Sequence, residues 1–560
     1  MKYLLATLFL ISLLSAQVSF TKFPEDLQLY ARNLETDSAT VQIEGTVNSS
    51  GVSYTSVLLK IHRSDTLVDS LSQLLIFLNN TAAFSFTPQI KAELANYSFV
   101  LYGVTVTGEN LEKKAEKVCA GDAFIIQGQS NAQAMSSNGD ANVNQGPFIR
   151  VFGSADTTPQ TPMNWFLGEG NDEYDGDGNT GQWGLRLARL IVDNHNIPVA
   201  IFNGALGGRP VQYFQRNEDN PATLYDNYGR LLIRLNKSGL KNHIRGIFWH
   251  QGEGNAGSNA THRLDTEGYK TYWNALYNDW MEDIPSVTKT YIFQIRSGCF
   301  STIDRILQIK EAHRQLALET DNVEIMSTSG VQQHTDKCHY AYETGYKLFG
   351  EHIYRLVNRD FYNGVAEADI EPPQVLRAER TGDREITLVM DNADDTYTWD
   401  TGAETELTFT GASVSVTSVT VDGRHIKLGL SGNASGITAI TFRGHDNTPE
   451  PMVRNANGIG AVHFNQLPVT EPVFTSYKQN TQEQTLSFYK TGSIVTIEFS
   501  KVLRFNKAQI VNTHGRVVKT FPKNQDQKPL KWDAQKEQKG VYYFQVTGSN
   551  NATAWPMVLF

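Results

Sequence analysis

The stretch Gly121-Asp-Ala-Phe-Ile-Ile-Gln-Gly-Gln-Ser-Asn131 decides the fold of the central part of this chain. Its apolar run, Ala123 to Ile126, predicts a strand that ends in a glycine-containing turn carrying Ser130. Such a turn exposes a hydroxyl at the carboxyl edge of a sheet, where N–H groups of the next helix can stabilise an oxyanion. Ser130 is therefore a candidate nucleophile, although a serine here can also simply cap the helix.

Two later strand-like segments also end in polar residues. Pro198-Val-Ala-Ile-Phe202 leads into Gly204-Ala-Leu-Gly-Gly-Arg-Pro210, whose paired glycines let a main-chain N–H approach a ligand or simply form a tight turn. Ile244-Arg-Gly-Ile-Phe-Trp-His-Gln-Gly-Glu-Gly-Asn255 ends in an amide with two N–H donors, which can also belong to an Asx turn. Both segments supply candidate oxyanion donors.

The candidate general base lies in Asp336-Lys-Cys-His339. An imidazole is the usual base for a serine, and a nearby carboxylate fixes its tautomer and orientation. The three-residue spacing lets the two side chains share one face of a turn. His334 and His250 are alternatives, but only His339 has a carboxylate three residues before it.

Taken in this order, the four blocks resemble the SGNH (GDSL-type) hydrolases, and more narrowly the sialate O-acetylesterases and related carbohydrate acetylesterases. The resemblance covers roughly Val118 to Arg359. It implies a flavodoxin-like three-layer α/β domain. This agrees with the alternation of strands with helices, which are expected over residues 183–192, 306–318 and 342–357. An α/β-hydrolase is disfavoured because Ala132 stands where the G-x-S-x-G elbow requires glycine.

The resemblance also implies roles for individual residues. Ser130 would be the nucleophile, His339 the base and Asp336 the orienting acid. Glu253 is a rival acid, because some relatives use the glutamate of the Trp-His-Gln-Gly-Glu block. The oxyanion hole would combine the N–H groups of Ser130 and Gly208 with the side chain of Asn255. No cofactor is needed for this chemistry.

Three further polar residues near these blocks are candidate substrate contacts: Gln129, Arg209 and Gln251. Gln251 and Glu253 have an alternative role as bridges between loops. Arg209 has the ordinary alternative of an exposed, solvated charge.

The chain of 560 residues is too long for one core and predicts a multidomain protein. We expect a signal peptide over residues 1–16, a β-sandwich over 17–117, the SGNH hydrolase domain over 118–362, an accessory β-sandwich over 363–475 and a C-terminal β-sandwich over 485–560. The alternating, β-branched pattern of the flanking parts, with turn residues between short segments, is typical of sandwiches.

Both ends of the chain predict export. Lys2, an apolar core and Ser15-Ala16 form a secretory signal, and no apolar run reaches the ~20 residues of a membrane span. The last ~75 residues resemble the C-terminal sorting domain of the type IX secretion system of Bacteroidetes, through His514-Gly-Arg516 and Gly540-Val-Tyr542. The usual terminal lysine is missing from Trp555-Pro-Met-Val-Leu-Phe560. We expect a secreted or cell-surface protein that passes the periplasm and engages that machinery.

Cysteines and acidic residues leave two questions open. Cys299 and Cys338 are both expected at the catalytic edge, where they form either a disulfide or two free thiols, whereas Cys119 is expected to be buried. The acidic, glycine-rich segment 171–181 hints at calcium, but its spacing does not fit an EF-hand, so we expect a solvated loop and no metal.

With a formal net charge of -10, the chain has no basic surface suited to nucleic acid. The predicted function is a secreted serine esterase that removes O-acetyl groups from sialate or plant polysaccharide through an acetyl-enzyme. One alternative is a catalytically inactive carbohydrate-binding or adhesion protein. Another is a lipase or thioesterase of the same fold.

Overall fold

A computed structural model gives the fold as two compact units. One contains Met1–Pro372 and Arg443–Asn465, and the other Pro373–Phe442 and Gln466–Phe560. The predicted signal peptide lies outside the described residues. These are residues 17–135, 139–156, 158, 161–171, 176–257, 259–299, 301–333, 336–365, 367–444, 452–471, 486–491, 494–499, 507–512, 516–521, 529–535, 540–547 and 552–559.

The first unit is organised around a sheet with the strand order β12-β11-β13-β10-β14-β15-β16. All neighbouring pairs in it are parallel except β11 with β12. Parallel strands place their carboxyl ends at one edge, where ligand sites form in α/β sheets. The strands are β10 (Glu109–Gly128), β11 (Ile149–Phe152), β12 (Trp165–Leu167), β13 (Val199–Asn203), β14 (Ile244–His250), β15 (Lys289–Gln294) and β16 (Val323–Ser327).

Helices cover both faces of this sheet. Alternate strand residues point to opposite sides, so Ala123 and Ile125 pack with α3, α5 and α6, whereas Phe124 and Ile126 pack with α2 and α7. The helices predicted around 183–192 and 306–318 lie within α2 and α6. The helix predicted around 342–357 begins as a π-helical turn over Tyr342–Tyr346 and continues as α7. The helices of the unit are α1 (Ser130–Gln133), α2 (Gln182–His195), α3 (Asn227–Lys237), α4 (Glu253–Ala256), α5 (Thr266–Asp283), α6 (Ile303–Glu319) and α7 (Lys347–Phe361).

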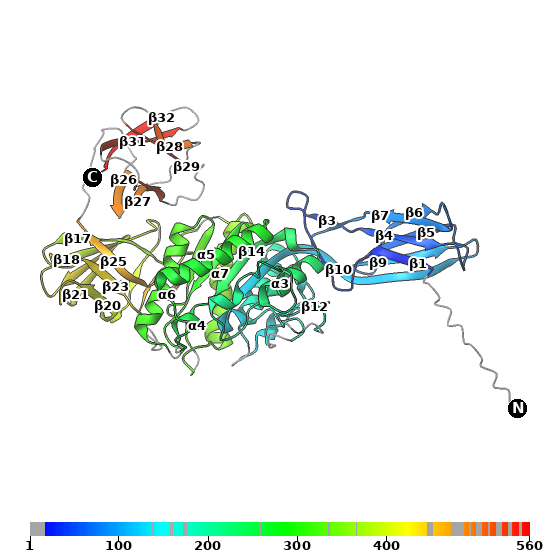
Figure 1. Cartoon of the computed structure of the whole chain (residues 1–560), viewed down its shortest axis with the longest axis horizontal. Coiled ribbons are helices and arrows are strands. Elements are labelled where there is room, and N and C mark those ends of the chain that lie inside the picture. Colours follow the sequence, from blue (N-terminus) through cyan, green and yellow to red (C-terminus); the bar gives the residue numbers. More distant parts are fainter. Residues whose placement is uncertain are drawn as a thin grey trace. The chain divides into compact units, whose positions relative to one another are not determined.

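Strand β10 pairs both with N-terminal strands and with strands of the central parallel sheet (Figure 1). Its first half pairs antiparallel with β9, and its last residues lie between β13 and β14. The register with β9 shifts between Ala115 and Val118, where Lys117 takes a φ of 57°. Such a bulge bends a strand without ending it. β10 therefore crosses the predicted boundary at residues 117/118 without interruption.

The N-terminal strands form further small sheets. β1, β4 and β7 make one sheet, and β3 pairs with β8. β2 and β9 both pair with β10, and β5 and then β6 follow outward from β9. Buried residues alternate with exposed ones along β7 and with half-buried ones along β4. The strands are β1 (Val18–Lys22), β2 (Leu29–Ala31), β3 (Ser38–Thr40), β4 (Ile43–Asn48), β5 (Ser56–Arg63), β6 (Thr66–Leu74), β7 (Thr81–Phe86), β8 (Gln89–Lys91) and β9 (Tyr97–Val104).

The second unit is made of strands. A seven-stranded sheet has the order β20-β23-β25-β17-β18-β22-β21, and two smaller sheets have the orders β26-β27-β30 and β29-β28-β31-β32. Most pairs in them are antiparallel, and β17 pairs with β25 in parallel. The strands are β17 (Val375–Gly382), β18 (Glu385–Met390), β19 (Thr398–Trp399), β20 (Leu407–Thr410), β21 (Val416–Asp422), β22 (His425–Leu430), β23 (Ala439–Phe442), β25 (Phe464–Thr470), β26 (Leu486–Thr491), β27 (Ile494–Phe499), β28 (Lys507–Asn512), β29 (Val517–Phe521), β30 (Leu530–Asp533), β31 (Gly540–Thr547) and β32 (Ala552–Leu559).

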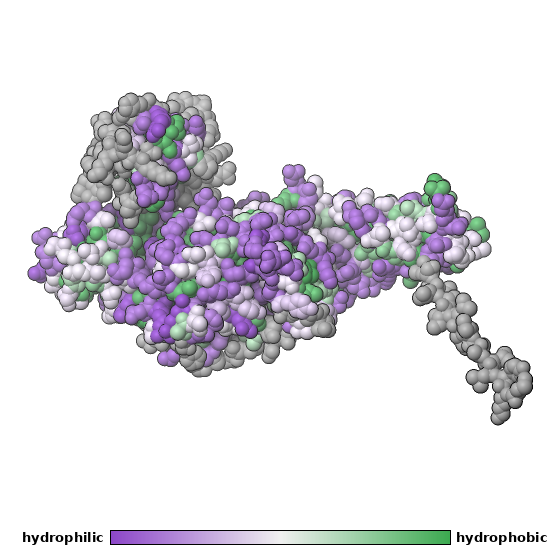
Figure 2. Space-filling model, viewed as in Figure 1, coloured by the Kyte–Doolittle hydropathy of each residue, from purple (hydrophilic) through white to green (hydrophobic). Residues whose placement is uncertain are grey.

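The segment that returns to the first unit carries β24 (Val453–Arg454). There the main chain of His463 exchanges two hydrogen bonds with the side chain of Gln294, both over 2.8 Å. The visible face of the helical part is mostly hydrophilic (Figure 2). Across the described residues, no helix has the length and apolar character needed to span a membrane.

Candidate functional site

Ser130 opens the short helix α1, directly after β10. Residues 118–129 and 131–134 are all buried, and Ser130 alone among them is half-buried. The preceding residue is fixed to the neighbouring strand, because the N–H of Gln129 donates to the carbonyl of His250 over 3.0 Å. The turn thus presents one accessible hydroxyl at the carboxyl edge of the sheet.

The glycine pair after β13 lies against this serine. A Cβ built on Gly207 would stand 3.6 Å from the Cβ of Ser130, and the N–H of Gly207 donates to the side chain of Gln133 over 3.0 Å. Gly208 has a φ of 70° and open space around an added Cβ. Among the described residues, its N–H donates to no protein acceptor. That N–H remains available to a ligand.

The predicted acid and base are in contact. Nδ1 of His339 and Oδ2 of Asp336 are 2.6 Å apart, while Oδ1 of Asp336 accepts the N–H groups of Cys338 and His339 over 2.9 and 3.0 Å. Partial burial alone would raise the pKa of Asp336. The hydrogen bonds from the His339 ring and from the two N–H groups outweigh it and hold this pKa below its usual value. The imidazole is thereby oriented by an ionised carboxylate.

Asn131 connects the serine turn to the histidine loop. Its buried side-chain amide donates to the carbonyl of Cys338 over 3.2 Å and to Oε1 of Glu253 over 2.8 Å. Its Oδ1 accepts the hydroxyl of Tyr346, and its own carbonyl accepts the indole N–H of Trp183, each over 2.9 Å. Asn131 was not among the predicted site residues. Its sequence signal is an amide directly after the candidate nucleophile.

Glu253 is buried beside the same amide. Its Oε1 lies 3.6 Å from Nε2 of His250, and its Oε2 has no hydrogen-bond partner among the described residues. Burial raises the pKa of Glu253, against the opposing effects of the Asn131 hydrogen bond and the nearby His339 charge. The carboxylate that hydrogen-bonds the His339 ring is that of Asp336.

His250 is placed differently from a general base. It is fully buried, its ring stacks on Phe293 with centroids 5.3 Å apart, and burial lowers its pKa to about 3. Both ring nitrogens lack hydrogen-bond partners in the described part of the chain. His250 is therefore a neutral core residue. The other alternative, His334, lies outside the described residues.

Gln129, Gln251 and Asn255 form a buried amide network. Nε2 of Gln251 donates to Oε1 of Gln129 and to Oδ1 of Asn255, over 3.1 and 2.8 Å. The Gln129 oxygen also accepts the N–H of Gly254 over 2.9 Å. The amides of Gln129 and Gln251 are thus used within the protein, where they join the serine turn to the Trp-His-Gln-Gly-Glu block.

Both N–H donors of Asn255 have protein partners. Nδ2 donates to Oε1 of Gln212 over 2.9 Å and to the carbonyl of His262 over 2.7 Å. A contact with an oxyanion would therefore replace one of these hydrogen bonds.

Arg209, in contrast, is exposed beside Gly208, and its guanidinium lies 4.7 Å from the ring centroid of Tyr213, a cation–π contact.

A disulfide joins Cys299, after β15, to Cys338 in the histidine loop. The sequence was compatible with either a disulfide or two free thiols, and the structure contains the disulfide. The N–H of Cys299 also donates to the carbonyl of Lys337 over 3.1 Å, and Gln333 donates to the carbonyl of Ser297 over 2.9 Å. These contacts fix the loop that carries His339. Cys119 is a buried free thiol.

Within the described ranges, no group of three or more His, Cys, Asp or Glu side chains is placed to hold a metal ion. Residues 172–175 of the acidic segment 171–181 lie outside those ranges.

Comparisons with known families match two parts of the chain. Residues 120–357 match the family described as carbohydrate esterase, sialic acid-specific acetylesterase. Residues 491–558 match the secretion system C-terminal sorting domain, of the type IX kind. No curated protein matches the chain in sequence.

Among solved structures, a carbohydrate acetylesterase from Xanthomonas citri aligns with a TM-score of 0.55 at 16% identity, covering 80% of this chain and 99% of its own. A protein from Arabidopsis thaliana aligns with a TM-score of 0.33 at 18% identity over 43% of this chain and 99% of its own. A family two carbohydrate esterase from Clostridium thermocellum aligns with a TM-score of 0.26 at 11% identity, over 58% of this chain and 92% of its own.

The likeness to the Xanthomonas citri structure shows the fold that this chain shares with that protein. The sorting domain indicates export to the cell surface or secretion. The multidomain chain therefore carries a domain of the sialic acid-specific acetylesterase family of carbohydrate esterases, together with a C-terminal sorting domain of the type IX secretion system.

Proposed function

We propose that this protein is a serine esterase that removes O-acetyl groups from carbohydrates through an acetyl-enzyme intermediate. The observation that carries the proposal is the contact between His339 and Asp336 in a loop that Asn131 ties to the turn of Ser130. A serine with an accessible hydroxyl and an imidazole oriented by a carboxylate are the groups that nucleophilic acyl transfer requires.

In the proposed mechanism, Ser130 attacks the acetyl carbonyl while His339 accepts its proton. His339 then returns a proton to the sugar oxygen, which leaves as an alcohol. A water molecule, deprotonated by His339, attacks the acetyl-enzyme, and His339 passes this proton to Oγ of Ser130 as acetate leaves. Asp336 keeps Nδ1 of His339 protonated, which leaves Nε2 as the nitrogen that would accept the serine proton. Its low pKa supports this role over that of Glu253.

The negative charge on the tetrahedral intermediate would be stabilised by the N–H groups of Ser130 and Gly208. The unoccupied N–H of Gly208 and the position of Gly207 against Ser130 support this assignment. Asn255 would contribute a third donor by exchanging its hydrogen bond with Gln212 for one with the substrate oxygen.

We assign the central domain to the SGNH hydrolases with flavodoxin-like layering. The parallel strand order and the helices on both faces of the sheet support this assignment. The flanking strands would form β-sandwiches, and we retain the division into 17–117, 118–362, 363–475 and 485–560. The substrate is an acetylated oligo- or polysaccharide, with sialate and plant polysaccharide esters as the two classes to test.

The test is acetate release by the purified chain from acetylated xylan, pectin and O-acetylated sialoglycans, compared with Ser130→Ala and His339→Ala. We expect release from at least one substrate by the wild-type protein and none by either variant. Acetate release that persists in folded Ser130→Ala would refute the mechanism. A folded wild-type protein that hydrolyses no acetyl ester would instead favour a carbohydrate-binding role.

A further inference from the structure

The disulfide between Cys299 and Cys338 lies close to the proposed base. Sγ of Cys338 is 4.0 Å from Nε2 of His339, the nitrogen that would accept the proton of Ser130. Both cysteines are half-buried, as is His339, so a small reagent can reach the bridge. A sulfur atom therefore stands beside the atom on which the proposed proton transfer depends.

The chemistry of this sulfur depends on the bridge. In the disulfide, Sγ of Cys338 has neither a proton nor a charge. A free thiol can pass its proton to a neighbouring imidazole, which yields a thiolate and an imidazolium. The carboxylate of Asp336, 2.6 Å from Nδ1 of His339, would stabilise that positive ring. A protonated Nε2 cannot accept the proton of Ser130, so a free thiol here would remove the base.

The bridge also joins two segments with unfavourable backbone conformations. Cys299 has a φ of 53°, and Lys337, the residue before Cys338, has a φ of 57°. Each such conformation costs a residue with a Cβ about 1 to 2 kcal/mol and persists only where the surrounding structure enforces it. Opening the bridge removes one of these constraints. The sulfur and the imidazole of the loop are then able to come closer than 4.0 Å.

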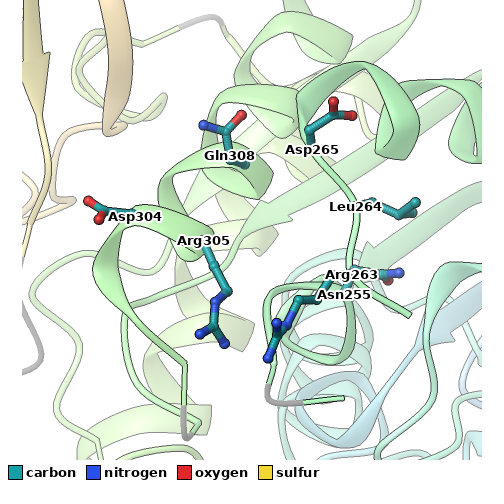
Figure 3. Close-up of a pocket in the computed structure, with 7 residues that line it drawn as sticks. All are labelled: Asn255, Arg263, Leu264, Asp265, Asp304, Arg305 and Gln308. Carbon is teal, nitrogen blue, oxygen red and sulfur yellow. The ribbon is translucent and has the colours of Figure 1, made fainter. Parts of the chain in front are cut away.

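The Cys299 end of the bridge leads into an anchored segment. Nη1 of Arg305, at the beginning of α6, donates to the carbonyl of Gly257 over 3.3 Å, just after α4. Arg305 also lines a pocket of about 460 Å³ beside that loop (Figure 3). Because this end is held, movement after opening of the bridge falls mainly to the end with Cys338 and His339.

We propose that the Cys299–Cys338 disulfide keeps His339 available as the base, and that reduction of this disulfide switches the esterase off. The inference rests on the proposed function, because it concerns the base of that reaction. Disulfides form and persist outside the reducing cytosol. The enzyme would therefore become active on the export that its sorting domain indicates.

The switch is an ordinary thiol–disulfide exchange. One thiolate of an added dithiol attacks a sulfur of the bridge, and the S–S bond breaks. The second sulfur of the reagent then displaces the attached cysteine, which closes the reagent into a cyclic disulfide. The two cysteine sulfurs take up the protons that the reagent loses. The thiol of Cys338 then gives its proton to Nε2 of His339.

The wild-type chain tests this switch directly. Reduction with dithiothreitol should lower kcat for a small acetyl ester about tenfold or more, with little change in KM, and reoxidation should restore it. Alkylation followed by mass spectrometry verifies that the bridge is open, and thermal melting verifies that the protein is folded. Cys119, a buried free thiol, should stay unmodified as long as the fold is intact.

Two variants separate the effect of the thiol from the loss of the bridge. Cys299→Ser removes the bridge and leaves a free thiol at Cys338. The double variant Cys299→Ser/Cys338→Ser removes both, and a serine hydroxyl does not ionise near neutral pH. A bridge with only a structural role predicts equal losses of kcat. We expect the double variant to have a kcat about tenfold or more above that of the single variant, and dithiothreitol to affect neither.

The reactivity of Cys338 gives a readout that requires no ester. In Cys299→Ser, iodoacetamide should modify Cys338 readily at about pH 6, below the usual pKa of a thiol, because His339 stabilises the thiolate. Adding His339→Ala to this variant should slow the modification about tenfold or more. Both rates would be measured on folded protein by peptide mass spectrometry.

The inference is overturned if reduced, folded wild-type protein keeps its kcat, or if the single and double variants lose kcat equally. It is also overturned if the modification rate of Cys338 does not depend on His339. The proposed function fails in a different way. An oxidised, folded wild-type protein that hydrolyses no acetyl ester would refute the esterase, while His339-dependent modification of Cys338 would still establish the contact between sulfur and imidazole.

Discussion

The side chain of Asn131 donates to the main-chain carbonyl of Cys338 over 3.2 Å, which joins the residue after Ser130 to the residue before His339. The same amide group donates to Oε1 of Glu253 over 2.8 Å. One buried side chain thereby connects the proposed nucleophile turn, the Trp-His-Gln-Gly-Glu block and the base loop. We infer that the relative position of Ser130 and His339 depends on Asn131.

Asn131→Ala should lower kcat by more than its loss of stability would explain, with little change in KM for a small acetyl ester. The substitution removes the hydrogen bond between the turn of Ser130 and the loop of His339, whose side chains must react together. The loss of buried hydrogen bonds should also cost about 1 to 3 kcal/mol of unfolding free energy. The matched control is Asn144→Ala, another buried amide, which donates to the carbonyl of Ala141 over 2.9 Å. Steady-state kinetics and thermal melting would be compared. Equal effects on kcat in the two variants would contradict the positioning role.

The identity of the acid is tested by comparing Asp336→Asn with Glu253→Gln. Asp336 holds Nδ1 of His339 over 2.6 Å, and its amide variant would favour the wrong tautomer. We expect kcat/KM to fall about 10³- to 10⁴-fold in Asp336→Asn and less than about tenfold in Glu253→Gln. The opposite ranking, measured on one aryl acetate, would assign the acid role to Glu253.

Glu253 also predicts a pH dependence of stability. Burial raises its pKa in the folded protein, so its contribution to stability is present at low pH and is lost as pH rises through the folded pKa. Glu253→Gln cannot titrate. The melting temperature of the variant minus that of wild type should therefore increase between about pH 4 and pH 8. A difference that stays constant over this range would show that Glu253 does not carry the shifted pKa.

Gly208→Ala tests the oxyanion role with little steric interference, since an added Cβ at Gly208 meets no atom within 4 Å. The φ of 70° should cost about 1 to 2 kcal/mol once a Cβ is present and should shift the N–H. Gly239→Ala is the matched control, with a φ of 77° and equally open space. We expect similar losses of melting temperature but a fall in kcat, about tenfold or more, only in Gly208→Ala. An unchanged kcat in Gly208→Ala would remove Gly208 from the oxyanion hole.

Local features of the site could be predicted from the sequence because they depend on short-range geometry. The contact of Asp336 with His339 follows from a three-residue spacing, and the strand expected over residues 198–202 is β13, because apolar runs between turn residues define strands. The helix expected over residues 306–318 lies within α6 for a similar reason, its apolar periodicity.

Contacts between distant segments could not be predicted in this way. The side chain of Asn131 hydrogen-bonds Glu253 and Cys338, which lie 122 and 207 residues away in the sequence, and no local pattern specifies these contacts. The same limit applies to the amides of Gln129, Gln251 and Asn255, whose orientation is set by three loops at once. The continuity of β10 past residue 117 also escaped prediction, because a bulge at Lys117 resembles a strand end in sequence.

The central claim is that Ser130 carries the acetyl group during turnover, and rapid quenching of the reaction in acid followed by peptide mass spectrometry tests it most directly. Wild-type protein mixed with an activated acetyl ester should yield an acetylated peptide containing Ser130, with the modification on that residue. The same peptide from Ser130→Ala should remain unmodified, and the folded variant should release no acetate. Acetylation at another residue that persists in an active Ser130→Ala variant would contradict the account.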